Sequence, residues 1–286
     1  MNRFAIRWIE ETSSSSLNLA HKLHSIVMII ITGDRRSGTS VWMQILQGGG
    51  FQILGEMFPA HWKDLMEQAN PKGFYESTLV QGINYHTNPD PNSGAWIPPD
   101  KVTRVGVKIF ADGLVKTDYA YITNVIFTIR KWQECAASQV RMDEIRTKSS
   151  APDGIEPNAE RAQELPPGFR WWQANFSIIK DTRTRRYPAA VFSYAALLEN
   201  PEKIIGAAFK WLGGGNAAAA VSVVEQSLRT QKNIRLPNID HDYSEVFDEF
   251  YNTLHSNQQI TPAFYAKLVE TDKKISQEIR AILASK

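Results

Sequence analysis

The sequence Ile29-Ile-Ile-Thr-Gly-Asp-Arg-Arg-Ser-Gly-Thr-Ser40 joins an apolar run to a glycine-containing turn. The run starts at Ile26 and is mostly β-branched, as expected for a strand that is covered on both faces of a parallel sheet. After the turn, apolar residues recur at helical spacing from Val41 to Leu46, and three glycines at 48–50 end that pattern. The stretch therefore predicts a strand, a turn and a helix in direct succession.

The predicted turn has the features of an anion-binding loop. Backbone N–H groups at the start of a helix lack partners within the helix, and the helix dipole favours negative charge there. Thr39 and Ser40 add hydroxyl donors, and Gly33 and Gly38 let the backbone close around a phosphate. The spacing is close to the phosphate loop G-x-x-x-x-G-K-[ST], but Thr39 stands at the lysine position and the cation comes earlier, at Arg36. We therefore expect a phosphate site without the usual ATP-binding apparatus.

The rest of the chain alternates strand and helix patterns. The candidate strands are residues 26–31, 51–54, 102–109, 124–129 and 189–194. The clearest helix follows Asn200-Pro201, where Asn suits the N-cap and Pro the first helical position. This alternation predicts an α/β fold of the P-loop-like, three-layer αβα type, with a central and mostly parallel sheet.

The 286 residues, 43% of them hydrophobic, suffice for a single α/β domain, which we place at residues 26–286. We expect residues 1–25 to form a peripheral N-terminal segment, with a serine linker at residues 13–16. Residues from about 146 to 170 contain four prolines and many charges, which predicts a mobile excursion from the domain. From about residue 244 onward the pattern is helical.

Composition narrows the classes of partner. A net charge of +2 gives no general argument for nucleic acid as a partner. The longest aliphatic run is too short to span a bilayer, and the N-terminus lacks the pattern of a signal peptide. The single cysteine, Cys135, excludes an internal disulfide and fits a reducing compartment, so we expect a cytoplasmic protein. His61, His86 and His241 are scattered without metal-ligand spacing, and we expect no metal.

Two motifs resemble those of sulfotransferases that use the sulfate donor PAPS. In that family the loop for the 5′-phosphosulfate reads roughly [K/R]-S-G-T-[T/S], which residues 36–40 match at every position. The arginine version is more similar to the tyrosylprotein branch than to the cytosolic branch. The family's motif for the 3′-phosphate is an arginine that ends a strand, with a serine eight residues later, and here Arg130 and Ser138 stand in those places.

The resemblance implies sulfuryl transfer from PAPS to an acceptor hydroxyl or amine by in-line displacement, with PAP as the product. It places the following residues at the donor: Arg35, Arg36, Ser37, Gly38, Thr39, Ser40, Arg130, Ser138 and Tyr194. Arg36 would be the cation at the phosphosulfate, and Lys108 would reach the sulfuryl group. Tyr194 lies in a segment similar to a late strand of the family near the nucleotide.

The sequence indicates the general base less clearly than it indicates the residues at the donor. Phe110 occupies the place of the histidine that cytosolic members carry two residues after their lysine. The tyrosylprotein branch uses a glutamate about twenty residues after the loop arginine, and Glu56 stands at that distance from Arg36. Glu56 is therefore the expected base, with Glu76 and Asp112 as alternatives.

Two other functions remain open at this point. A nucleotide kinase or related P-loop phosphotransferase shares the fold logic but needs the lysine that Thr39 replaces. A non-catalytic protein would bind a nucleotide through the same loop but would catalyse no transfer. A basic stretch with Arg229, Lys232 and Arg235 either closes over the 3′-phosphate of the donor or forms a solvated face.

Overall fold

The structure is a computed structural model that describes residues 28–58, 70–88, 98, 105–148, 165–224 and 242–285. Three of the predicted features fall wholly or mostly outside these residues: the peripheral segment 1–25, the excursion at about 146–170 and the basic stretch 229–235. Two of the scattered histidines, at positions 61 and 241, also lie outside them.

The centre of the fold is a five-stranded sheet in the order β2-β3-β1-β4-β5. Its strands are β1 (Met28–Gly33), β2 (Gln52–Leu54), β3 (Val105–Lys108), β4 (Asn124–Ile129) and β5 (Ala189–Ser193). All neighbouring pairs are parallel. The predicted α/β fold is therefore confirmed, and each of the five candidate segments supplies one strand.

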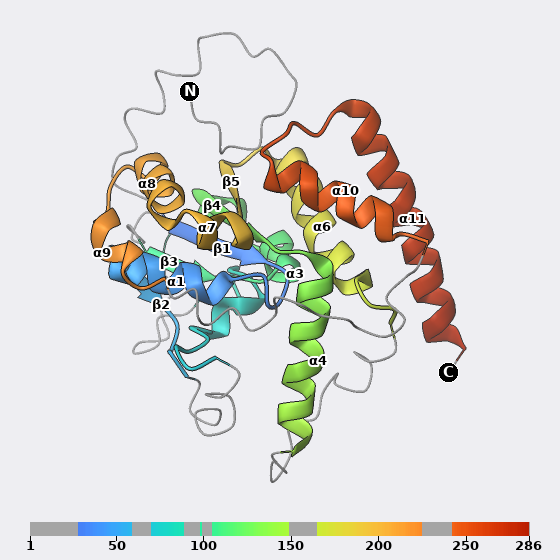
Figure 1. The fold of residues 1–286 in the computed structure, drawn as a ribbon, viewed down its shortest axis with the longest axis horizontal. Coiled ribbons are helices and arrows are strands. Elements are labelled where there is room, and N and C mark those ends of the chain that lie inside the picture. Colours follow the sequence, from blue (N-terminus) through green and yellow to red (C-terminus); the bar gives the residue numbers. More distant parts are fainter. Residues whose placement is uncertain are drawn as a thin grey trace.

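Helices cover both faces of the sheet and make three layers (Figure 1). One face carries α1 (Thr39–Gly48), α7 (Tyr194–Glu199), α8 (Pro201–Trp211) and α9 (Ala217–Val221). The other face carries α3 (Ala111–Lys116), α4 (Trp132–Lys148), α6 (Phe169–Arg185), α10 (Ser244–His255) and α11 (Pro262–Ala284). Two 3-10 turns complete the described elements, η2 (Thr78–Gln81) and η4 (Tyr119–Tyr121). As predicted, Asn200 caps α8 by accepting a hydrogen bond from the N–H of Lys203.

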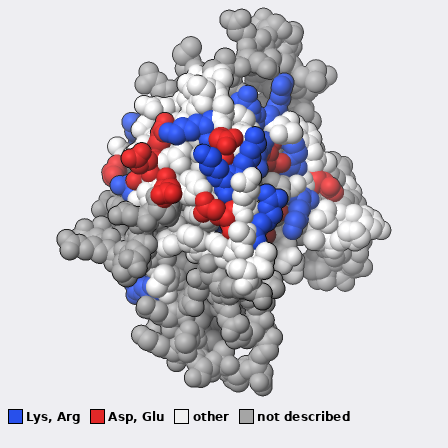
Figure 2. All heavy atoms as spheres, turned by 90° about the vertical axis from the view of Figure 1, so that its right-hand side faces the viewer, with Lys and Arg blue, Asp and Glu red and all other residues white. Residues whose placement is uncertain are grey.

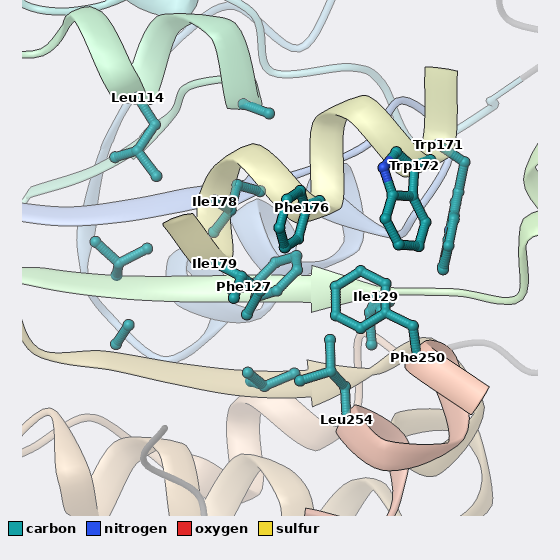
Figure 3. Packing of buried hydrophobic residues seen from close by; sticks show 14 of the residues in the cluster. Leu114, Phe127, Ile129, Trp171, Trp172, Phe176, Ile178, Ile179, Phe250 and Leu254 are labelled. Carbon is teal, nitrogen blue, oxygen red and sulfur yellow. The ribbon is translucent and has the colours of Figure 1, made fainter. Parts of the chain in front are cut away.

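An aromatic cluster fixes α6 and α10 against the sheet. Figure 3 shows Trp171, Trp172 and Phe176 of α6 pointing toward β4 and toward Phe250 of α10. Trp172 is fully buried and stacks on Phe247 with ring centroids 5.1 Å apart. Burial of such large rings supplies most of the packing energy here. The cluster therefore holds the start of α6 at the carboxyl end of β4.

The described residues at both ends of the predicted excursion are helical, since α4 continues to Lys148 and α6 begins at Phe169. One predicted strand boundary was wrong. The last strand ends at Ser193, and Tyr194 is the first residue of a helix rather than the end of the strand. The reason is local, since the Ser193 hydroxyl accepts a hydrogen bond from the N–H of Ala196 at 3.0 Å and caps α7.

Replacing Ser193 by alanine is expected to lower the free energy of unfolding by about 1–2 kcal/mol. The change removes both the cap and the 2.7 Å hydrogen bond between the Ser193 hydroxyl and Nδ1 of His255. Urea denaturation would measure the difference. Ser222→Ala is the matched control, because Ser222 is exposed and its hydroxyl bonds within its own turn. Equal stability of both variants would contradict the role of the cap.

Candidate anion-binding site

The loop after β1 is held in shape by its own side chains. Gly33 has a φ of 152°, and a Cβ there would lie 2.5 Å from both the Ser37 hydroxyl and the carbonyl oxygen of Thr128, so no other residue fits. The Ser37 hydroxyl donates to the carbonyl of Asp34 at 2.7 Å and lies 2.7 Å from the hydroxyl of Thr128. The Ser37 hydroxyl, which was predicted to contact the donor, therefore makes its hydrogen bonds within the loop and to Thr128 of β4.

The loop presents the start of α1 toward the carboxyl edge of the sheet. Gly38 precedes the helix with a φ of 106°, and the first helical bond runs from the N–H of Trp42 to the carbonyl of Gly38. The N–H groups of the residues between them lie at the positive end of the helix dipole. Thr39 is buried at this end, and Ser40 is partly buried. This end of α1 therefore has the geometry of an anion site.

Arg36 and Arg130 meet beside the loop, although they are 94 positions apart in the chain. Arg130 follows β4 and donates from Nη1 to the carbonyl oxygen of Arg36 at 3.2 Å. Arg36 has a φ of 70° and donates from Nε to the hydroxyl of Ser138 at 2.9 Å. The two predicted phosphate-binding motifs thus lie at the same edge of the sheet, where β1 and β4 end, and they are in contact.

This arrangement concentrates positive charge in a partly buried place. Burial lowers the pKa of the Arg36 guanidinium, and Arg130 and Arg141 lower it further. Like charges held this close are stabilised by an anion between or beside them. Arg141 is exposed on α4, three residues beyond Ser138, and the sequence analysis missed it. Helical spacing was the available signal, because Glu134, Ser138 and Arg141 recur along one face of a helix.

Two internal contacts orient Arg130. Its Nε donates to Oε2 of Glu134 at 2.8 Å, and its guanidinium carbon lies 4.6 Å from the centroid of the Tyr194 ring. That ring is mostly buried and also packs against Gly38, where a Cβ would come within 2.8 Å of it. Tyr194, predicted to contact the nucleotide, therefore supports both the loop and Arg130.

Lys108 lies on the other side of the loop, at the end of β3. It is 2% exposed, and burial lowers the pKa of its ammonium group. Its Nζ donates to the carbonyl of Phe74 at 2.7 Å, lies 3.4 Å from the hydroxyl of Ser40, and pairs with Oε1 of Glu76 at 3.0 Å. The ammonium group therefore lies next to the start of α1.

The three candidate bases have different surroundings. Glu56 and Glu76 face each other across an antiparallel β-bridge, with the N–H of Glu56 donating to the carbonyl of Glu76 at 3.1 Å. Glu56 is exposed, whereas the carboxylate of Glu76 contacts Lys108. Asp112 is exposed in the first turn of α3. The structure thus brings Glu76 to the loop and leaves the side chains of Glu56 and Asp112 in solvent.

Arg35 and Asp34 complete the loop. Arg35 is exposed, and its guanidinium carbon lies 5.1 Å from the centroid of Phe110, whose ring also lies 5.2 Å from Nζ of Lys108. Burial raises the pKa of the Asp34 carboxyl to about 7, although Arg35 and Arg170 act in the opposite direction. Sequence reasoning missed Asp34, because an acidic residue in an anion-binding loop carries no motif of its own.

The basic residues of the C-terminal helices form a different kind of surface. Figure 2 shows Lys and Arg side chains gathered beside Asp and Glu on the side of the molecule that carries α10 and α11. Ion pairs in these helices and the neighbouring α6 include Lys180 of α6 with Asp272 of α11 at 3.0 Å and Lys267 of α11 with Glu249 of α10 at 2.5 Å. Exposed pairs of this kind contribute little and are typical of a solvated helical face.

In the parts of the chain that the structure describes, no cluster of three or more His, Cys, Asp or Glu side chains could hold a metal ion. None of the helices described there is both long and apolar enough to cross a membrane. No protein-family model matches this chain, and no curated protein matches it. Function must therefore be inferred from the site itself.

Proposed function

We propose that this protein is a PAPS-dependent sulfotransferase that transfers the sulfuryl group to an acceptor hydroxyl or amine. The observation that carries the proposal is the contact of Arg36 with Ser138 and with Arg130 at the start of α1. PAPS carries phosphate groups on the 5′ and 3′ positions of one ribose, so its binding site needs two cationic positions within the reach of one nucleotide. The paired arginines supply two such positions.

Each part of the site has a role in the proposed reaction. The N–H groups at the start of α1 and Arg36 would bind the 5′-phosphosulfate, and Arg130 with Ser138 would bind the 3′-phosphate. The acceptor oxygen attacks sulfur in line, and the bond from sulfur to the 5′-phosphate oxygen breaks. Arg36 and Lys108 would balance the charge that grows on the sulfuryl oxygens and on the departing phosphate.

The same loop argues against a nucleoside triphosphate as the preferred ligand. A phosphotransferase of the P-loop class places a lysine after the second glycine, where it reaches the β- and γ-phosphates. Thr39 fills that position and is only 4% exposed. Lys108 approaches from β3 instead, and its Nζ lies 3.4 Å from the hydroxyl of Ser40 at the start of α1.

Isothermal titration calorimetry with PAP tests the proposal. We expect PAP to bind without magnesium, and about tenfold or more tighter than ATP with magnesium. AMP, which lacks the 3′-phosphate, should also bind about tenfold or more weaker, because it offers no anion to Arg130. Magnesium-dependent binding of ATP without binding of PAP would instead support a phosphotransferase. Binding of PAP without transfer of labelled sulfate from PAPS to any of a panel of phenols, alcohols, amines or water would support a non-catalytic nucleotide-binding protein.

A further inference from the structure

We infer that Glu76, rather than Glu56, is the general base that takes the proton from the acceptor. This inference rests on the proposed function and names a catalytic group in the same site. Glu56 stands at the expected distance from Arg36 along the sequence, but spacing along the chain does not decide which carboxylate faces the reacting atoms.

The segment that carries Glu76 is tied directly to the anion-binding loop. The carbonyl oxygen of Phe74 accepts hydrogen bonds from Nζ of Lys108 at 2.7 Å and from the hydroxyl of Ser40 at 3.2 Å. Tyr75 is buried and has a φ of 55°, a backbone conformation that costs energy for a residue other than glycine. Gly55 fits against its carbonyl, since a Cβ at Gly55 would lie 2.6 Å from that oxygen. This fixed path sets the position of the Glu76 side chain.

The carboxylate of Glu76 is linked to the anion-binding loop through the ammonium group of Lys108. Its Oε1 lies 3.0 Å from Nζ of Lys108, which in turn lies 3.4 Å from the hydroxyl of Ser40. The Glu76 side chain is 21% exposed, so an acceptor approaching from solvent can reach it, whereas that of Lys108 is 2% exposed. A base must lie within hydrogen-bond reach of the proton that it removes, and Glu76 combines this access with proximity to the sulfuryl position.

The other two carboxylates lack this combination. The β-bridge connects Glu56 to the site through the backbone, and its side chain is exposed. Asp112 lies in the first turn of α3, where its side chain is exposed, and among the described residues no hydrogen bond or ion pair ties it to Lys108 or to the anion-binding loop.

The pairing with Lys108 also couples proton transfer to sulfuryl transfer. As the acceptor oxygen attacks sulfur, its proton moves to the Glu76 carboxylate, and the electron pair of the breaking S–O bond leaves with PAP. Protonation neutralises Glu76 and weakens its attraction for the Lys108 ammonium group. The ammonium is then released toward the sulfuryl oxygens and the leaving phosphate while negative charge grows there. Glu76 returns its proton to water after the products leave.

Glu76→Gln is the decisive variant, because glutamine keeps an oxygen for Lys108 but cannot take a proton. Sulfate transfer from labelled PAPS is measured with phenol and with 4-nitrophenol, which is ionised above neutral pH and needs no base. With phenol, kcat should fall about 100-fold or more, and with 4-nitrophenol less than about tenfold. The Kd of PAP should stay within about twofold, since no donor contact is removed. The matched control Glu56→Gln should change kcat by less than about threefold.

The possible outcomes separate the inference from the proposed function. An equal loss with both phenols would mean that Glu76 only positions Lys108, and a loss in Glu56→Gln alone would assign the base to Glu56. Either result overturns the inference while leaving the sulfotransferase proposal intact. If the wild-type protein does not bind PAP, or binds it without transfer to any acceptor or to water, the proposed activity itself fails and the inference falls with it.

Discussion

Arg130→Ala is expected to weaken PAP binding by about 100-fold or more. Arg130 is mostly buried, and its guanidinium offers a planar fork that fits a phosphate with two parallel hydrogen bonds. Its removal also takes away the cation that lies 2.8 Å from the carboxylate of Glu134 in the native protein. The negative charge of Glu134, no longer offset by Arg130, then opposes binding of the 3′-phosphate, so the loss exceeds that of a single charged hydrogen bond. Calorimetry with PAP measures the change.

Three comparisons show whether the loss arises at the 3′-phosphate. AMP should bind Arg130→Ala nearly as well as wild type, because it lacks that phosphate. Adding Glu134→Gln to Arg130→Ala should restore about tenfold of the PAP affinity by removing the opposing negative charge. Arg185→Ala breaks an ion pair on the far end of α6 and should leave PAP binding unchanged. PAP affinity of Arg130→Ala within about threefold of wild type would contradict the proposed donor site.

The sequence predicted the sheet well because four of its five strands are buried on both faces. Residues 28–31 are a continuous apolar run and residues 124–129 a nearly continuous one, because a strand between two helical layers has no solvent face to break the run. Boundaries were harder to predict. Tyr194 favours strands by propensity, but the hydroxyl of Ser193 satisfies the N–H of Ala196 and starts a helix one residue earlier. A side-chain contact of this kind is difficult to predict from the sequence alone.

In the candidate site, too, some contacts could be predicted from the sequence and others could not. The contact between Arg36 and Arg130 followed from a general rule, since the carboxyl ends of adjacent parallel strands meet at one edge of the sheet. The placement of Glu76 against Lys108 did not follow from any such rule. It depends on how the chain turns back through Tyr75 to form the β-bridge between Glu76 and Glu56. That turn requires an unfavourable φ that no residue pattern predicts. The inward role of the Ser37 hydroxyl was likewise not predictable, because a loop hydroxyl can face a ligand or its own backbone.

Asp34→Asn is expected to stabilise the protein by roughly 2–4 kcal/mol at pH 8. Burial raises the pKa of the Asp34 carboxyl from 3.8 to about 7, so the folded state holds its proton at pH values where the unfolded state has lost it. The free energy of unfolding therefore falls as pH rises from about 4 to 7, and the full loss is present above that range. Asparagine has no proton to lose, and its oxygen can still accept the hydrogen bond from the N–H of Arg35.

Urea denaturation of the two proteins at several pH values checks both the size and the sign of this effect. The difference in unfolding free energy should be negligible at pH 3.5, grow up to about pH 7 and stay constant above it. Asp118→Asn is the control, because that residue is exposed and should show no such pH-dependent gain. Lower stability of Asp34→Asn at pH 8 would mean that the carboxylate is ionised and held by Arg35 and Arg170, whose charges would then outweigh burial. Because the Asp34→Asn substitution also removes a negative charge from the loop, PAP binding at pH 8 should be retained or tightened, which separates a stabilising change from damage to the anion site.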